Sequence, residues 1–282
     1  MHHLLDEFEE VCAAQAHHPA ACDQDLSLDY SSLQAAAGAL ARQIELETAQ
    51  PRVGILAPTS TLGAVAIFAC WYAGKVPVPL NFLLGPQELG KVIADAGLDL
   101  VLATEHFAPM AGAAGLKSLR LNAGGLARKP RVPPPAAARD VAVVLYTSGT
   151  SGDPKGVCLS FDNLLQNARA CVRHARISPD QAFLGVLPQF HSFGFTALTV
   201  VPLLLGATVH YLPRFSPTAV VRSIAENRIS VLIVIPSLLA AIANTKNVEG
   251  QMLGSLRLTV SGGEPLTVSR KLPSIWPSTF FV

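Results

Sequence analysis

The segment at residues 145–157, LYTSGTSGDPKGV, decides the fold class, because it places three glycines, several hydroxyls and one lysine directly after an apolar run. Residues 141–147 have the composition of a buried strand, and residues 161–175 have the spacing of an amphipathic helix. A strand, a glycine-rich loop and a helix in that order are typical of anion binding at the carboxyl edge of a parallel sheet. The segment therefore predicts an α/β protein with a phosphate-binding loop.

The side chains of this loop favour a polyphosphate ligand. Glycines allow successive backbone N–H groups to converge on phosphate oxygens, hydroxyls add donors, and a lysine adds a compact positive charge. A plain surface turn would explain the glycines but not the run of hydroxyls. The predicted phosphate-binding residues are Thr147, Ser148, Gly149, Thr150, Ser151, Gly152 and Lys155.

Spacing argues against three familiar motifs in this loop. A Walker A loop needs Gly-Lys followed by Ser or Thr, but Lys155 lies between Pro154 and Gly156. The dinucleotide spacing G-x-G-x-x-G does not occur here, and neither Ser148 nor Ser151 has the two flanking glycines of a serine hydrolase. A P-loop NTPase is therefore disfavoured.

Strand-like and helix-like segments alternate on both sides of this loop. Apolar runs at 52–58, 98–104, 182–188 and 229–236 predict buried strands, and the segments between them predict crossover helices. The class is therefore α/β, with parallel sheets flanked by helices. In the segment at residues 26–47, Ser31 or Ser32 is the expected N-cap of an alanine-rich helix. Asp162 is the expected N-cap of the helix that follows the phosphate loop.

A proline-rich stretch divides the chain into two predicted units. Four prolines, at 130 and 133–135, interrupt any apolar period in RKPRVPPPAAAR. We therefore expect a first α/β subdomain at 1–128, a linker at 129–139, and a second α/β subdomain with the phosphate loop at 140–282.

Composition narrows the partners and the compartment. The 282 residues are 50% hydrophobic and carry a formal net charge of +1 without a long basic block, which argues against nucleic acid as a partner. The five cysteines lack C-x-x-C spacing, and the acidic N-terminus lacks the features of a targeting peptide, so we expect buried reduced thiols in a cytoplasmic protein. The paired histidines at 2–3 and 17–18 are expected to be solvated. The apolar runs at 62–73 and 193–205 are too short or interrupted for a membrane span and predict buried helices.

Three segments together resemble one enzyme family. YTSGTSGDPKGV resembles the phosphate-loop signature of the adenylate-forming (AMP-binding) superfamily, which includes the acyl-CoA and acyl-acyl-carrier-protein synthetases. LPQFHSFGF at 187–195 resembles the second signature of that family, and SGGEP at 261–265 resembles its adenine-binding turn. The resemblance extends from about residue 26 to residue 266, in the order of the family.

This resemblance implies an ATP-dependent reaction in two steps. A carboxylate attacks the α-phosphorus of ATP to give an acyl-adenylate and pyrophosphate, and a thiol of coenzyme A or of an acyl carrier protein then takes the acyl group. The resemblance implies that the loop holds the β and γ phosphates with Mg²⁺ bridging, and that His191 lies at the mouth of the carboxylate pocket. It gives no metal-ligating residue in this chain. The residues implied to lie against adenine are Gly262, Gly263, Glu264 and Pro265.

The sequence after His191 narrows the range of carboxylic acids that the resemblance allows as substrates. Amino-acid-activating members carry an aspartate shortly after the second signature, but HSFGFTALTVVPLLLG has no acidic residue. An unpaired ammonium group in this apolar surrounding would be costly, so an α-amino acid is disfavoured. The apolar walls of the helix predicted at 193–205 suit a fatty or other hydrophobic acid, although the same stripe would also serve as ordinary core.

The chain departs from the family after the SGGEP turn. Family members continue with a Y-G-x-T-E signature, a ribose-binding aspartate and a C-terminal lid domain with a catalytic lysine, and none of these follows here. From about residue 271 two prolines interrupt the expected helix. We therefore expect a truncated chain with impaired turnover, with a separate chain as one conceivable source of the absent domain. The alternative hypothesis is a catalytically inactive nucleotide-binding or interaction module derived from such a ligase.

Overall fold

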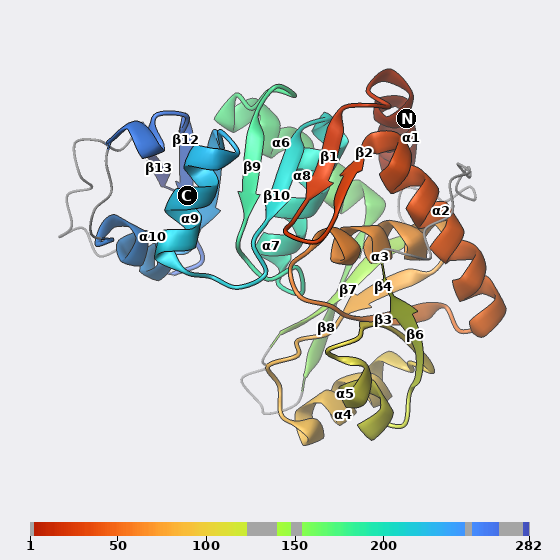
Figure 1. Cartoon of the computed structure of the whole chain (residues 1–282). Helices are drawn as coiled ribbons and strands as arrows, with labels where there is room; N and C mark the ends of the chain where they lie inside the picture. The colour runs from red at the N-terminus through yellow and green to blue at the C-terminus, as the bar shows by residue number, and fades with distance from the viewer. Residues whose placement is uncertain (1–2, 123–139, 148–153, 246–249, 265–278, 282) are drawn as a thin grey trace.

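The computed structural model describes residues 3–122, 140–147, 154–245, 250–264 and 279–281. Two sheets built mainly from parallel strands, together with one antiparallel hairpin, are flanked by helices (Figure 1). The predicted α/β class with parallel, helix-covered sheets is confirmed.

The larger sheet has seven strands in the order β13-β12-β11-β9-β10-β1-β2. All of its neighbours are parallel except β1 and β2, which form an antiparallel pair. Its strands are β1 (Pro19–Cys22), β2 (Ser27–Asp29), β9 (Ala182–Gly185), β10 (Thr208–Tyr211), β11 (Val231–Val234), β12 (Leu258–Ser261) and β13 (Thr279–Phe281).

The smaller sheet is wholly parallel and has four strands in the order β4-β3-β5-β6. It contains β3 (Arg52–Leu56), β4 (Val76–Pro79), β5 (Leu100–Thr104) and β6 (Lys117–Leu121), connected by α3 (Thr61–Tyr72), α4 (Pro86–Ala96) and α5 (Ala108–Ala113). The hairpin consists of β7 (Val141–Thr147) and β8 (Lys155–Ser160).

The remaining helices are those that do not connect the strands of the smaller sheet. They are α1 (Leu4–Ala14), α2 (Tyr30–Glu47), α6 (Phe161–Ala175), α7 (Ser192–Phe195), α8 (Val201–Leu205), α9 (Pro217–Glu226) and α10 (Pro236–Ala243), with a π-helix η2 (Thr196–Val200) and a 3₁₀ turn η3 (Gly250–Leu253). No helix in the described part of the chain is long and apolar enough to cross a membrane.

The two sheets do not simply follow the predicted division of the chain. β1 and β2 come from the predicted first subdomain, yet Ala21 of β1 pairs with Val209 of β10 in the larger sheet. The proline-rich linker at 129–139 lies outside the described residues, so the division into two units stays a prediction.

The main core is largely aliphatic, includes residues of both sheets, and contains a series of packed aromatic rings. Phe8, Phe68 and Trp71 pack against one another, with ring centroids 4.1 Å and 4.9 Å apart along this series. The indole N–H of Trp71 donates to the carbonyl oxygen of Ala142 at 2.7 Å, so the buried ring also secures the start of β7. The predicted buried helix at 62–73 is confirmed, since α3 is buried along almost its whole length.

The predicted helix at 193–205 is confirmed but contains a π-helical turn. Pro202 has no N–H to donate to the carbonyl oxygen of Leu198, and the hydroxyl of Tyr211 donates to that oxygen instead, at 3.0 Å. The N–H of Val201 donates to Thr196 in the i to i−5 pattern of a π-helix. A side chain from β10 thus stabilises the irregular turn.

Three helix starts differ from the sequence-based expectations. The N-cap of α2 is Asp29, whose carboxylate accepts from the N–H of Ser32 at 2.7 Å, so the predicted Ser31 or Ser32 cap is wrong. The N-cap of α6 is Ser160, and Asp162 lies in the first turn of the helix instead. His3 is buried rather than solvated, because its ring caps α1 and packs on Phe161 at 4.6 Å.

The cysteines are all reduced but not all buried. Cys12 and Cys70 are buried and Cys158 is exposed, while Cys22 and Cys171 are intermediate. The expectation of buried thiols is therefore wrong for Cys158, which lies on the outer strand of the hairpin.

Candidate functional site

The predicted phosphate loop joins two antiparallel strands instead of a strand and a helix. Thr147 at the end of β7 pairs with Lys155 at the start of β8, so the two ends of the loop lie opposite each other. The strand–loop–helix prediction is wrong, because β8 intervenes before α6 and Ser160 already caps that helix. The loop residues Ser148, Gly149, Thr150, Ser151 and Gly152 lie outside the described residues.

Tight packing holds the hairpin next to α4. The hydroxyl of Tyr146 donates to the carboxylate of Asp95 at 2.5 Å. Burial, followed by this hydrogen bond, raises the pKa of Tyr146 above its ordinary value. A Cβ at Gly156 would lie 2.9 Å from Val144 and 3.1 Å from the Tyr146 ring, so a larger residue here would force these side chains of β7 to shift. The predicted phosphate loop therefore lies on a hairpin whose ends are fixed.

The second signature segment is fixed by buried hydrogen bonds. The amide oxygen of Gln189 accepts from the N–H of Ser60 at 3.1 Å, and its amide nitrogen donates to Thr199 at 3.1 Å. The hydroxyl of Thr59 donates to the carbonyl oxygen of Leu187 at 3.1 Å. The segment between β9 and α7 is thereby tied to both the start of α3 and the π-helix.

His191 lies at the N-cap of α7 with its side chain exposed. Its ring lies beside that of Phe190, with the centroids 4.6 Å apart. Partial burial against this neighbour lowers the pKa of His191 from its ordinary value, since burial disfavours the charged imidazolium. A neutral, accessible imidazole at this position is suited to contact a carboxylate substrate or the adenylate.

The predicted adenine-binding turn follows β12 directly. Gly262 donates its N–H to the carbonyl oxygen of Val234 at 3.3 Å, and Gly263 has a φ of 83°, which favours glycine. The carboxylate of Glu264 accepts from the N–H and the hydroxyl of Ser237 at 3.1 and 3.2 Å, and so anchors the turn to the start of α10. Pro265 lies outside the described residues.

A large apolar cavity of about 550 Å³ brings two of the predicted segments together. Phe193 of the second signature and Gly262 and Gly263 of the turn line it, and a Cβ at Gly263 would lie 4.0 Å from the Phe193 ring. The cavity is lined by Ala170, Cys171, His174, Ala175, Ile177, Phe193, Ala197, Val201, Ile233, Val260, Gly262 and Gly263. His191 and the ends of the phosphate hairpin are not among these residues.

The contribution of α6 to this cavity was missed from the sequence. Ala170, Cys171 and His174 line it from the C-terminal half of α6, and neither Cys171 nor His174 was given a role. The signal in the sequence is their spacing of three and four residues, which places them on one side of the helix, but the amphipathic pattern marks a different face, formed by Phe161, Leu164, Leu165 and Ala168. The sequence alone therefore does not indicate what the side with Ala170, Cys171 and His174 contacts.

One polar group at this site lacks an internal partner. The hydroxyl of Ser261, the residue before Gly262, is buried and has no hydrogen-bond partner among the residues that the structure describes. Ser261 is not among the residues that line the cavity, so this hydroxyl is not evidence for a ligand there. Within the described ranges, no three His, Cys, Asp or Glu side chains group together in a way that could hold a metal ion.

The sequence model of the family described as AMP-binding enzyme matches residues 8–272. The chain belongs to the AMP-binding enzyme family. Among its curated relatives, it is similar to a feruloyl-CoA synthase from an Amycolatopsis species, at 33% identity over 85% of this chain and 50% of that protein. It is also similar to 4-coumarate–CoA ligase 5 of Oryza sativa subsp. japonica, at 28% identity over 79% of this chain and 46% of the rice protein. The chain spans about half the length of these relatives.

Solved structures of AMP-binding enzymes share this fold. ATP-bound MatB from Rhodopseudomonas palustris matches with a TM-score of 0.80 and 26% identity, over 93% of this chain and 55% of that one. The N-terminal domain of FACL13 from Mycobacterium tuberculosis matches with a TM-score of 0.84 and 23% identity, over 98% of this chain and 73% of that one. The second likeness shows the fold alone.

Proposed function

We propose that this protein activates a hydrophobic carboxylic acid with ATP, forming an acyl-adenylate, and transfers the acyl group to a thiol. The observation that carries the proposal is the apolar cavity that opens at the glycine turn, because it places room for an acyl group next to the residues expected to contact adenine. Membership of the AMP-binding enzyme family and the CoA-ligase names of its relatives support the reaction class.

The cavity lining favours a monocarboxylic acid with an apolar body. No arginine or lysine is among the residues that line it, so a second carboxylate would be buried without a charged partner. Phe193 offers an aromatic face, while Ala197 and the two glycines leave room beside it. A fatty acid or an aryl-propenoic acid such as ferulate therefore fits better than a dicarboxylic or an amino acid.

The nucleotide would be held by two separate parts of the chain. Lys155 and Thr147, at the facing ends of the hairpin, would contact the β and γ phosphates together with the loop residues between them. Gly262 and Gly263 would lie against adenine, with Glu264 keeping the turn in place through Ser237. Mg²⁺, when bound, would supply charge neutralisation on the phosphates. The assignments of Gly262 to Pro265 and of the loop remain proposals.

His191 would contact the reacting carboxylate, although it is not among the described residues that line the cavity. Because its pKa is lowered, the ring is neutral at physiological pH and could donate one N–H to the reacting carboxylate without adding a charge. The step itself needs orientation and charge neutralisation more than a protein nucleophile. The thiol acceptor that we propose is coenzyme A, as in the names of the curated relatives, with an acyl carrier protein as the alternative.

ATP–pyrophosphate exchange tests this proposal with a panel of ferulate, octanoate, malonate and phenylalanine. The assay is run on the chain alone and after addition of the half of feruloyl-CoA synthase that the chain does not match, supplied as a separate polypeptide. We expect exchange with ferulate or octanoate and none with malonate or phenylalanine, and we expect it to be strongest after this addition. Exchange with malonate or phenylalanine as fast as with the hydrophobic acids would refute the substrate class.

A nucleotide-binding module without ligase activity is the second candidate function. It needs only the facing hairpin ends, Thr147 and Lys155, and the glycine turn at Gly263, all of which the described residues contain. This function predicts thermal stabilisation by ATP that Lys155→Ala abolishes, with no pyrophosphate exchange under either condition above. Exchange with any acid would eliminate it.

A further inference from the structure

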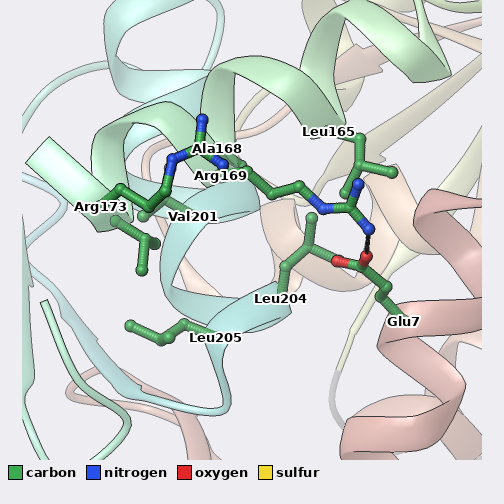
Figure 2. A pocket seen from close by; sticks show the side chains of 9 residues that line it. Glu7, Leu165, Ala168, Arg169, Arg173, Val201, Leu204 and Leu205 are labelled. Carbon is green, nitrogen blue, oxygen red and sulfur yellow. Dashed lines mark hydrogen bonds and ion pairs between the residues drawn. The ribbon is translucent and has the colours of Figure 1, made fainter. Parts of the chain in front are cut away.

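A second, smaller pocket lies between α1, α6 and α8, and the proposed reaction gives it no role. Its volume is about 190 Å³, and Figure 2 shows its walls. α6 contributes Leu165 and two arginines, α8 contributes Val201 and Leu205, and α1 contributes Glu7. The pocket combines an aliphatic floor with charged side chains, so its chemistry differs from that of the larger apolar cavity.

The charges of this pocket do not cancel. Arg169 forms an ion pair with Glu7 across the gap between α6 and α1, and both side chains are partly buried. Arg173 lies one helical turn further on the same face of α6, above Val201 and Leu205 in Figure 2. It has no acidic partner among the residues that the structure describes. Two guanidinium groups four residues apart repel each other unless an anion lies near both, and the carboxylate of Glu7 pairs with Arg169.

The floor of the pocket is aliphatic where the arginines leave it open. Leu165, Val201 and Leu205 contribute it; Val201 and Leu205 lie below Arg173, whereas Leu165 lies beside Arg169 (Figure 2). Apolar surface beneath an unmatched guanidinium suits a molecule with an anionic head and an apolar tail, because each part then meets its own environment. A neutral molecule would leave the charge of Arg173 without a partner, and an inorganic anion would leave the aliphatic floor in contact with water.

We propose that this pocket binds a small amphipathic carboxylate, with the carboxylate on Arg173 and a short aliphatic tail over Val201 and Leu205. A volume of about 190 Å³ is about six times the share of one water molecule in the liquid, which suits an acid of about six carbons. The planar guanidinium pairs with a carboxylate through two parallel hydrogen bonds.

A neighbouring groove lacks the basic residues of this pocket, so the proposed site is confined to the side of α8 that faces Arg169 and Arg173. The groove, of about 350 Å³, shares Glu7 and Leu204 with the pocket, but its lining includes Glu10 and no basic residue. The described lining of that groove therefore offers an anion no basic partner. Val201 lines both the anion pocket and the large apolar cavity, so a ligand in the pocket would press on a wall of the proposed acyl site.

Titration calorimetry with hexanoate tests this proposal on the whole chain without ATP, so its result does not depend on the ligase assignment. Hexanol serves as the neutral probe of the same length. We expect hexanoate to bind more tightly than hexanol, R173M to weaken hexanoate binding about tenfold, and E7Q to strengthen it because Arg169 is then released. The matched control R222M removes an exposed arginine from α9 and should leave binding unchanged.

The variant A197M distinguishes binding in the large cavity from binding in the small pocket, because Ala197 lines the large cavity but not the small pocket. Hexanoate binding that persists in A197M and is lost in R173M supports the site. Equal hexanoate affinity in wild type and R173M overturns it, as does hexanol binding as tight as hexanoate binding. If R173M only lowers thermal stability, Arg173 serves the C-terminal turn of α6 alone, and the proposal is also refuted.

Discussion

The second signature segment and the phosphate hairpin are held in opposite ways. Residues 187–190 are mostly buried, with Gln189, Leu187 and their partners joined by hydrogen bonds inside the core. On β8, by contrast, the four residues Lys155–Cys158 are exposed in succession. The second signature segment is part of the core, whereas β8 is held in place mainly by its pairing with β7. Substitutions in the second signature segment should therefore cost stability, whereas substitution of an exposed side chain on the hairpin, such as Lys155, should cost ligand binding alone.

The largest effect is expected for Gly194→Ala. A Cβ at this position would lie 2.1 Å from the carbonyl oxygen of Pro188, and because that atom belongs to the backbone, the signature segment itself must shift. We expect a loss of about 3 kcal/mol in the free energy of unfolding, measured by urea denaturation. Gly90→Ala is the matched control: a Cβ there meets nothing within 4 Å in an exposed helix, so we expect a gain of about 0.5–1 kcal/mol. Equal stabilities would contradict the packing described here.

The next effect concerns Gln189→Leu. The substitution removes the acceptor for the N–H of Ser60 and the donor to Thr199 while keeping a side chain of similar size. Because these groups are buried, we expect a loss of about 2 kcal/mol in the same assay. Gln87→Leu on the exposed face of α4 controls for the change in composition and should stay within about 0.5 kcal/mol of wild type. A similar loss in both variants would show that the hydrogen bonds are not responsible.

A smaller effect should appear in the pH dependence of stability. Burial lowers the pKa of His210 on β10 below its ordinary value of 6.5. The unfolded chain then binds a proton more readily than the folded one, so this contribution to stability is complete above pH 6.5 and is lost as the pH falls toward the folded pKa. The difference in stability between wild type and His210→Gln, measured at pH 8, 6.5 and 5, should shrink or reverse toward acid. A constant difference would refute the assignment.

The smallest change in stability is expected for Lys155→Ala. The residue is exposed on β8, so the free energy of unfolding should change by less than about 0.5 kcal/mol. Its loss should nevertheless abolish thermal stabilisation by ATP, whereas Arg222→Ala, which removes another exposed cation, should retain it. If both variants keep the ATP effect, the hairpin is not the phosphate site.

Sequence reasoning succeeded where apolar periodicity is long. The buried α3 and the parallel strands β3, β5, β9 and β11 follow from continuous apolar runs. It failed where a single side chain decides the local structure. Asp29 and Ser160 take the caps because their oxygens reach the N–H groups of Ser32 and Asn163, which depends on backbone direction. β8 was missed because four of its six residues are exposed and the strand has no buried alternate positions, so the pairing with β7 defines it.

The candidate site was predictable in its parts but not in its assembly. The motif residues at 191–193 and 262–263 are recognisable in the sequence, and Phe193 and the glycines do meet at one cavity. The contributions of Cys171 and His174 depend on which face of α6 turns inward, and the ion pair of Arg169 with Glu7 joins residues 162 positions apart. Neither contact leaves a local trace in the sequence.

The central claim is that the apolar cavity receives the acyl group of an adenylate whose adenine lies at the glycine turn. Calorimetric binding of a stable cinnamoyl sulfamoyl-adenosine, compared with sulfamoyl-adenosine lacking the acyl group, tests it directly. Ala197→Trp fills the cavity, and Ala197→Ser is the control that does not. We predict that Ala197→Trp weakens binding of the acylated compound by about tenfold or more and leaves binding of the unacylated compound unchanged. Equal affinities of both compounds for wild type and Ala197→Trp would contradict the claim.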